Sequence, residues 1–222
     1  DIFVPPTPNG LGIVDVCSTA WHSGRMQIDE HTALGTYDAL CAQGYTVFAV
    51  CCGSATRYTA LEQAAHVRAA VRFVKHHAVS FGLDAARLAL MGASAGGHLA
   101  ALAAVQPEPG RPSPRNPYAQ YDTAVAAVVL YFAPSDLLDF GGHRFLVREV
   151  AGFPLPKLLF EDGRATHERD AVDARLAELS PARRITGTPP PFLLWHGTAD
   201  PLVPLSQSQV LQAALRAAGG HC

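Results

Sequence analysis

The segment that most constrains the fold is an apolar run that leads without a break into Gly92-Ala93-Ser94-Ala95-Gly96. The run Arg87-Leu88-Ala89-Leu90-Met91 predicts a strand, and the small residues that continue to about Val105 predict a helix. A strand and a helix can join over so few residues only where the side chains at the turn are small. We therefore expect Ser94 to lie on a sharp turn between a strand and a helix.

Elsewhere along the chain, apolar runs alternate with segments of helical periodicity. The expected strands are 11–17, 45–50, 124–131 and 191–195, and the expected helices are about 30–43, 60–82 and 204–218. Such alternation predicts an α/β fold with a mostly parallel sheet and helices on both faces. We expect a single domain over residues 1–222, with a small cap or lid insertion at about 135–189.

The Gly-x-Ser-x-Gly pattern has a chemical interpretation for Ser94. A strained turn after a strand holds the serine hydroxyl out at the carboxyl end of the sheet, where the following helix directs its first amides toward developing negative charge. Ser94 is thus a candidate nucleophile. The alternative is a glycine-rich turn in which the serine is incidental.

A second candidate, Asp200, follows the last predicted strand in His196-Gly197-Thr198-Ala199-Asp200. Carboxyl ends of parallel strands meet at one edge of a sheet, which is where ligands bind in such folds. A carboxylate there can orient an imidazole that accepts the Ser94 proton. The alternative is that Asp200 only caps the next helix. His196 precedes the loop, so we interpret it as a structural residue of the turn.

Composition excludes several function classes. A formal net charge of −2 gives no reason to expect nucleic acid as a partner. The ten histidines show no metal-ligand spacing, and five cysteines are too few and odd in number for a disulfide framework. We expect no metal, no cofactor, no membrane span and a small-molecule substrate. Compartment and oligomeric state stay open.

Four segments together resemble a known family: Gly44-Tyr45-Thr46-Val47, Gly92 to Ala100, Pro189 to Leu194, and His196 to Pro204. They are similar to the esterase/lipase branch of the α/β-hydrolase superfamily, close to the feruloyl- and acetyl-esterase-like carbohydrate esterases. The resemblance implies a serine carboxylic-ester hydrolase that acts on small or carbohydrate-linked esters through an acyl-enzyme at Ser94, with Asp200 as the triad acid.

The chain departs from this family at the oxyanion loop. Relatives carry His-Gly-Gly-Gly-Trp where this chain has Cys17-Ser18-Thr19-Ala20-Trp21. By position, the resemblance assigns oxyanion donors to Thr19, Ala20 and Ala95, and a substrate contact to Trp21 as a wall of the acyl pocket. His22, which follows Trp21, is a candidate for substrate contact at the entrance, and the alternative is simple surface exposure. The alternative is that the loop only connects a strand to a helix. Cys51 and Cys52 replace a Tyr-Arg pair, and we interpret them as packing residues.

A second departure concerns the triad histidine. The family pattern puts it about ten residues beyond Cys222, and it has strands before Asp1, so we expect the chain to be truncated at both ends. His221 lies too early to reach Ser94 on this pattern. The alternative function is an α/β-hydrolase-like binding protein that has lost the histidine and does not catalyse.

Overall fold

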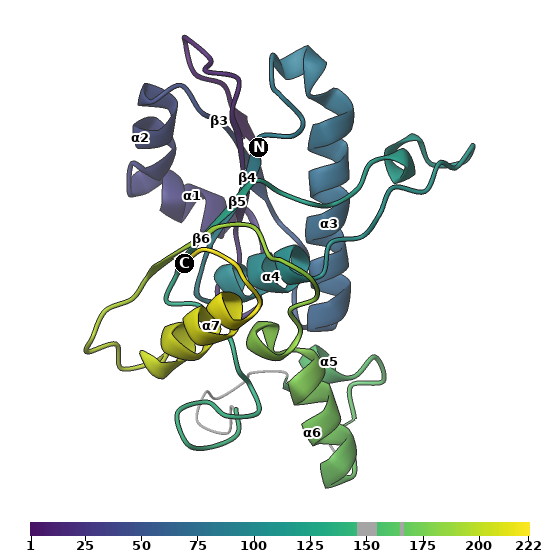
Figure 1. The fold of residues 1–222 in the computed structure, drawn as a ribbon, viewed down its shortest axis with the longest axis vertical. Coiled ribbons are helices and arrows are strands. Elements are labelled where there is room, and N and C mark those ends of the chain that lie inside the picture. Colours follow the sequence, from purple (N-terminus) through teal and green to yellow (C-terminus); the bar gives the residue numbers. More distant parts are fainter. Residues whose placement is uncertain (146–154, 165–166) are drawn as a thin grey trace.

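A computed structural model describes residues 1–145, 155–164 and 167–222 and contains one six-stranded sheet (Figure 1). The strands are β1 (Ile2–Phe3), β2 (Gly12–Val16), β3 (Thr46–Val50), β4 (Leu88–Ala93), β5 (Ala127–Tyr131) and β6 (Phe192–Trp195). Their order is β1-β3-β2-β4-β5-β6, with β1 antiparallel to β3 and the other pairs parallel. The predicted mostly parallel sheet is confirmed.

Helices lie on both faces of the sheet, as Figure 1 shows. They are α1 (Arg25–Ala33), α2 (Thr36–Ala42), α3 (Ala60–His77), α4 (Ser94–Val105), α5 (Leu155–Leu159), α6 (Arg169–Glu178) and α7 (Ser206–Ala217), with 3₁₀ turns η1 (Val79–Phe81), η2 (Pro117–Gln120) and η3 (Pro181–Arg183). The main core joins α3, α4 and α7 to one face, and a smaller core packs α1 and α2 on the other. None of the described helices has the length and apolar character needed to span a bilayer.

The helix expected over residues 30–43 is wrong in detail. The structure has two helices, α1 and α2, which are separated at Gly35. Gly35 has a φ of 72°, a left-handed value that interrupts helical hydrogen bonding and that glycine adopts at little cost. A glycine inside a helical pattern is an ambiguous signal, and tertiary packing decided for a break.

The start of α3 agrees with the sequence. The Thr59 hydroxyl accepts a hydrogen bond from the Glu62 amide at 3.2 Å, and the Glu62 carboxylate accepts one from the Thr59 amide at 2.7 Å. This reciprocal pair is a capping box, and it satisfies amides that the helix itself leaves unbonded. The predicted helix start is confirmed.

The predicted cap region, 135–189, contains α5, α6 and η3 among its described residues. Leu158, Leu176 and Leu179 are fully buried and belong to the main core. The region is therefore anchored to the rest of the domain through its leucines. Its role as a lid stays a prediction, and residues 146–154 and 165–166 lie outside the described part.

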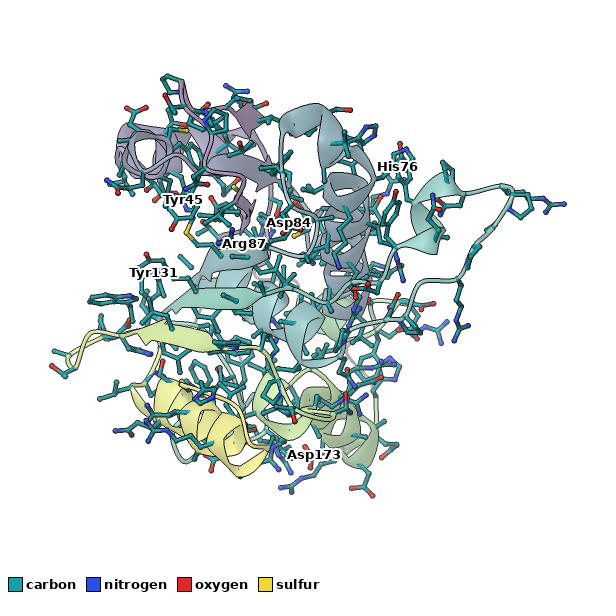
Figure 2. The ribbon with its side chains drawn as sticks, turned by 45° about the horizontal axis from the view of Figure 1, so that its top comes forward. Tyr45, His76, Asp84, Arg87, Tyr131 and Asp173 are labelled. Atoms are coloured by element: carbon teal, nitrogen blue, oxygen red, sulfur yellow. The ribbon has the colours of Figure 1, made fainter. Side chains whose placement is uncertain are left out.

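One face of the sheet is left open at β5 and β6. Leu193 and Trp195 on β6 are 51% and 58% exposed. A hollow of about 450 Å³ lies over this face between Tyr45, Arg87 and Tyr131 (Figure 2). Among the described residues, α2 packs against β3 on this face, and α1 packs against α2.

Candidate active site

Ser94 occupies the turn that the sequence predicts, between β4 and α4. Its φ is 49°, a left-handed value that costs a residue with a Cβ roughly 1–2 kcal/mol. The turn is held by close backbone contacts: a Cβ on Gly96 would lie 2.1 Å from the Val16 carbonyl oxygen, and one on Gly92 would lie 2.6 Å from Gly96. The half-buried Ser94 hydroxyl makes no hydrogen bond to any residue that the structure describes.

The Ala95 amide is well placed to bind an anion. Ala95 is the second residue of α4, where helical amides have no acceptor within the helix. Its neighbour Gly96 donates to the Ser18 carbonyl at 3.1 Å, which brings the β2 loop against the start of α4. Among the described residues, the Ala95 amide has no acceptor, so it is available to developing negative charge beside Ser94.

The loop after β2 is a tight hairpin-like turn. Thr19 and His22 exchange two backbone hydrogen bonds, each of 2.9 Å. Ala20 and Trp21 between them have φ values of 49° and 57°, the signature of a type I′ turn. Left-handed φ values favour glycine, so this turn holds residues with side chains in a conformation that suits the glycines of the family pattern.

This geometry corrects one predicted oxyanion donor. The Thr19 amide already donates to the His22 carbonyl and is not available to a substrate. The exposed Ala20 amide has no acceptor among the described residues. Of the two donors expected from the loop, Thr19 is therefore excluded, and Ala20 remains a candidate.

The predicted substrate contact of Trp21 is not supported by its position. Trp21 is only 4% exposed, and its indole Nε1 donates to His98 Nδ1 at 2.9 Å. His98 then donates from Nε2 to the Leu179 carbonyl at 2.7 Å, because Nδ1 must accept. Trp21 thus anchors the turn in the core through His98. No local sequence pattern indicates this hydrogen bond, because 77 residues separate Trp21 from His98.

His22 remains a candidate for substrate contact. It is partly exposed at the end of the turn, and its Nδ1 lies 2.9 Å from the Ala20 carbonyl. This contact stabilises the turn on its solvent side, whereas the Trp21–His98 hydrogen bond stabilises it on the core side. Its contact with a substrate stays a prediction.

His98 makes folding stability depend on pH. Burial disfavours its charged form and lowers its pKa from 6.5 to about 4. The unfolded chain therefore binds a proton that the folded chain does not, between pH 6.5 and 4. We expect the free energy of unfolding to fall as pH is lowered through this range, by at most about 3 kcal/mol.

Urea denaturation at pH 7 and pH 4.5 measures this effect, with His98→Leu as the comparison. The variant should be less stable at pH 7, because the Trp21 indole and the Leu179 carbonyl lose their partner. It should also lose less stability on acidification than the wild type. His31 has the opposite effect on the pH dependence of stability, since the hydrogen bond to Asp15 raises its pKa. Because wild type and variant both contain His31, its effect cancels in the comparison. An equal acid-induced loss in both would contradict the assignment.

Asp200 lies in the loop between β6 and α7. Its Oδ1 accepts hydrogen bonds from the Leu202 and Val203 amides, each at 2.9 Å. Burial pushes the pKa of Asp200 up, but these amides and the nearby His196 outweigh it and lower the pKa overall. Asp200 is therefore a charged carboxylate in a fixed orientation. Asp200 lies six residues before Ser206, where α7 begins, and the residue at the N-cap position is Leu205, so Asp200 does not cap α7.

Both ring nitrogens of His196 are engaged in this loop. Nδ1 lies 2.7 Å from the Ser208 hydroxyl, and Nε2 lies 2.8 Å from the Val203 carbonyl. His196 therefore ties the Asp200 loop to α7, in agreement with its interpretation as a structural residue. Its nitrogens are not free to accept a proton from Ser94.

His221 lies at the wrong edge of the sheet to act as the base. Its carbonyl accepts a hydrogen bond from the Phe192 amide, at the start of β6. Ser94 follows the carboxyl end of β4, which runs parallel to β5 and β6. Since the two ends of a strand lie at opposite edges, the interpretation of His221 as too early agrees with the structure.

Cys51 and Cys52 are free thiols with different surroundings. Cys51 is exposed and Cys52 is buried. Burial raises the pKa of Cys52 to about 11, so its thiol stays protonated at neutral pH. This agrees with the interpretation of Cys52 as a packing residue.

Taken together, the chain order and the geometry of these segments match a known family. The model of the family described as BD-FAE matches residues 1–215. The chain belongs to the BD-FAE family. This is an esterase-type family of the α/β-hydrolase superfamily, in agreement with the resemblance seen in the sequence.

Individual relatives, among named proteins and among solved structures, agree with this family assignment. The chain is 29% identical to the probable carboxylic ester hydrolase LipM of Mycobacterium tuberculosis over 197 residues, which are 89% of this chain and 43% of LipM. The bifunctional GH43-CE protein of Bacteroides eggerthii superimposes with a TM-score of 0.78 at 27% identity, over 99% of this chain and 31% of that one. Thermogutta terrifontis esterase 2, solved phosphoramylated by tabun, shares the fold with a TM-score of 0.70 at 24% identity, over 100% of this chain and 74% of that one. The chain thus spans less than half the length of LipM.

In this member of the BD-FAE family, the candidate site combines three segments at one edge of the sheet. Ser94 and Ala95 come from the β4–α4 turn, Ala20 from the turn after β2, and Asp200 from the loop after β6. The Gly96–Ser18 hydrogen bond joins the first two segments directly. β5 separates β4 from β6 in the sheet, so Asp200 lies two strands away from Ser94.

Proposed function

We propose that the protein is a serine carboxylic-ester hydrolase that acts on small or carbohydrate-linked esters. The observation that carries the proposal is the left-handed φ of Ser94 at the junction of β4 and α4. A serine in this strained position exposes its hydroxyl beside the free amides of a helix start, which is the arrangement that a nucleophile needs. The esterase relatives support ester hydrolysis as the reaction class.

In the proposed mechanism, Ser94 Oγ attacks the ester carbonyl and the alcohol leaves. The Ala95 and Ala20 amides stabilise the tetrahedral oxyanion, and water then releases the acid from the acyl-enzyme. Asp200 orients and stabilises the histidine that moves the proton. Both nitrogens of His98 and of His196 are already bonded, so we assign the base to neither of them.

Replacing Asp200 by asparagine tests this mechanism. We expect Asp200→Asn to lower the kcat for hydrolysis of p-nitrophenyl acetate by the full gene product about 10²–10⁴-fold, because the imidazolium loses its counter-charge. Stability should change little, since an amide oxygen can still accept from Leu202 and Val203.

Asp84→Asn is the matched control for this measurement. Asp84 also accepts a hydrogen bond from a backbone amide two residues along the chain, but it precedes β4, whereas Ser94 follows the other end of that strand. Its replacement should leave hydrolysis unchanged. Equal rates for wild type and Asp200→Asn would overturn the role of Asp200, and a wild type that binds esters without turnover would favour the non-catalytic alternative.

A further inference from the structure

A second cluster of polar side chains lies in the smaller core, on the sheet face opposite α4. Asp15 on β2 and Cys17 just after it are two residues apart in an extended segment, so they point to the same face. His31 from α1 and Tyr37 from α2 complete the cluster. His31 Nδ1 lies 2.7 Å from Asp15 Oδ2, and Cys17 Sγ lies 3.5 Å from the same oxygen.

Asp15 is incompletely satisfied in this setting. The residue is fully buried, and its Oδ2 accepts from Tyr37 at 2.9 Å and contacts His31. Its Oδ1 is buried and has no hydrogen-bond partner among the described residues. A buried carboxylate that is only partly hydrogen-bonded is costly, and a cation bound at Oδ2, the oxygen that faces His31 and Cys17, would offset the negative charge of the whole group.

The donor atoms are spaced for a metal ion. One donor atom each from Asp15, Cys17 and His31 lies within 4.8 Å of the others. A tetrahedral Zn²⁺, with bonds of about 2.0 Å to nitrogen and oxygen and about 2.3 Å to sulfur, holds its ligands roughly 3.3–3.6 Å apart. The 3.5 Å sulfur–oxygen distance already fits this spacing, and the 2.7 Å nitrogen–oxygen distance needs only a small opening.

We propose that Asp15, Cys17 and His31 form a structural Zn²⁺ site. A thiolate, an imidazole and a carboxylate are the ligand types that zinc takes in proteins, whereas Mg²⁺ and Ca²⁺ prefer oxygen ligands alone. The site lies outside the ester-hydrolysis machinery and does not depend on the proposed function.

The surroundings of the cluster supply the other parts of a metal site. Tyr37 donates to Asp15 and lies 3.3 Å from Cys17 Sγ, so it acts as an outer-shell group that orients two ligands. A pocket of about 280 Å³, with Asp15, His31, Gly92 and Ala93 among its lining residues, gives access and room for a water as the fourth ligand. Burial, and then the Asp15 charge, raise the pKa of the Cys17 thiol far above its usual value, so zinc binding must displace the thiol proton.

Zinc at this site would hold β2 to α1. Cys17 lies two residues before the Thr19–His22 turn, so the metal would also stiffen the start of the loop that presents Ala20. We therefore expect binding to raise the thermal stability of the folded chain.

Titration with Co²⁺, a spectroscopic substitute for zinc, tests the proposal on the metal-free full gene product. We expect one equivalent of Co²⁺ to produce an intense near-ultraviolet thiolate-to-metal absorption and visible bands of tetrahedral Co²⁺. Cys17→Ser and His31→Asn should abolish these signals. Cys51→Ser and Cys41→Ser, which remove thiols outside the cluster, should leave them intact.

Zn²⁺ should also raise the melting temperature of the wild-type chain, and Mg²⁺ should not. This measurement needs no variant, so it holds even where Cys17→Ser fails to fold. Absence of a thiolate absorption in the wild type, its loss in Cys51→Ser, or an unchanged melting temperature with Zn²⁺ would each overturn the site.

Discussion

Replacing Ser94 by alanine is expected to abolish covalent labelling by a fluorophosphonate and to lower ester hydrolysis by about 10³-fold or more. The reason is that the phosphorus reagent and the ester both react with an activated serine oxygen, and Ser94 is the serine on the strained β4–α4 turn. The measurement is peptide mass spectrometry of the labelled full gene product, together with hydrolysis of p-nitrophenyl acetate.

The wild type should carry one label, on the peptide that contains Ser94. A label at another serine, or labelling of Ser94→Ala equal to that of the wild type, would contradict the assignment. A folded wild type that takes no label would favour the binding-protein alternative.

Ser94→Gly separates the chemistry of this residue from its backbone strain. The variant should be as inactive as Ser94→Ala, but its free energy of unfolding should exceed that of Ser94→Ala by about 1 kcal/mol. Glycine adopts the 49° φ of this position without the penalty that a Cβ imposes. Equal stabilities for the glycine and alanine variants would show that the turn is unstrained.

Gly96→Ala is expected to destabilise the fold by about 3 kcal/mol or more, enough to unfold a marginally stable domain. An added Cβ would lie 2.1 Å from the Val16 carbonyl oxygen, a backbone atom at the end of β2. β2 is hydrogen-bonded on both sides, to β3 and β4, so neither strand can shift without breaking ladder bonds. The measurement is urea denaturation followed by circular dichroism.

Gly197→Ala is the matched control for this substitution. A Cβ there would meet no atom within 4 Å, and its φ lies outside the left-handed region. We expect its free energy of unfolding to stay within about 0.5 kcal/mol of the wild type. If Gly96→Ala unfolds at the same urea concentration as Gly197→Ala, the result would contradict the close contact between α4 and β2.

Local patterns in the sequence were sufficient for much of the fold. The apolar run before Gly92 predicted β4, and the Thr59–Glu62 pair predicted the start of α3. Each depends on interactions between residues within a few positions of one another, which a sequence pattern contains in full. The break at Gly35 was missed, because the same glycine is tolerated inside a helix and only packing of α1 and α2 decides between the two outcomes.

At the oxyanion loop, local sequence patterns were not sufficient to predict the structure. The sequence located the loop, but it assigned a donor to Thr19, whose amide is used by the His22 carbonyl. It also placed Trp21 against the substrate, whereas the indole is buried on His98, 77 residues away. Which amide is free and which side a ring faces depend on hydrogen bonds between distant segments.

By itself, the sequence determined the class of fold and the position of Ser94 on its turn, because small residues between a strand and a helix allow one local geometry. Only the tertiary structure decided which groups meet. It brought Asp15, Cys17 and His31 together without any metal-ligand spacing along the chain, and it engaged both nitrogens of His98. Contacts of this kind form when sheet order and helix packing join residues far apart in sequence, and no local pattern specifies that order.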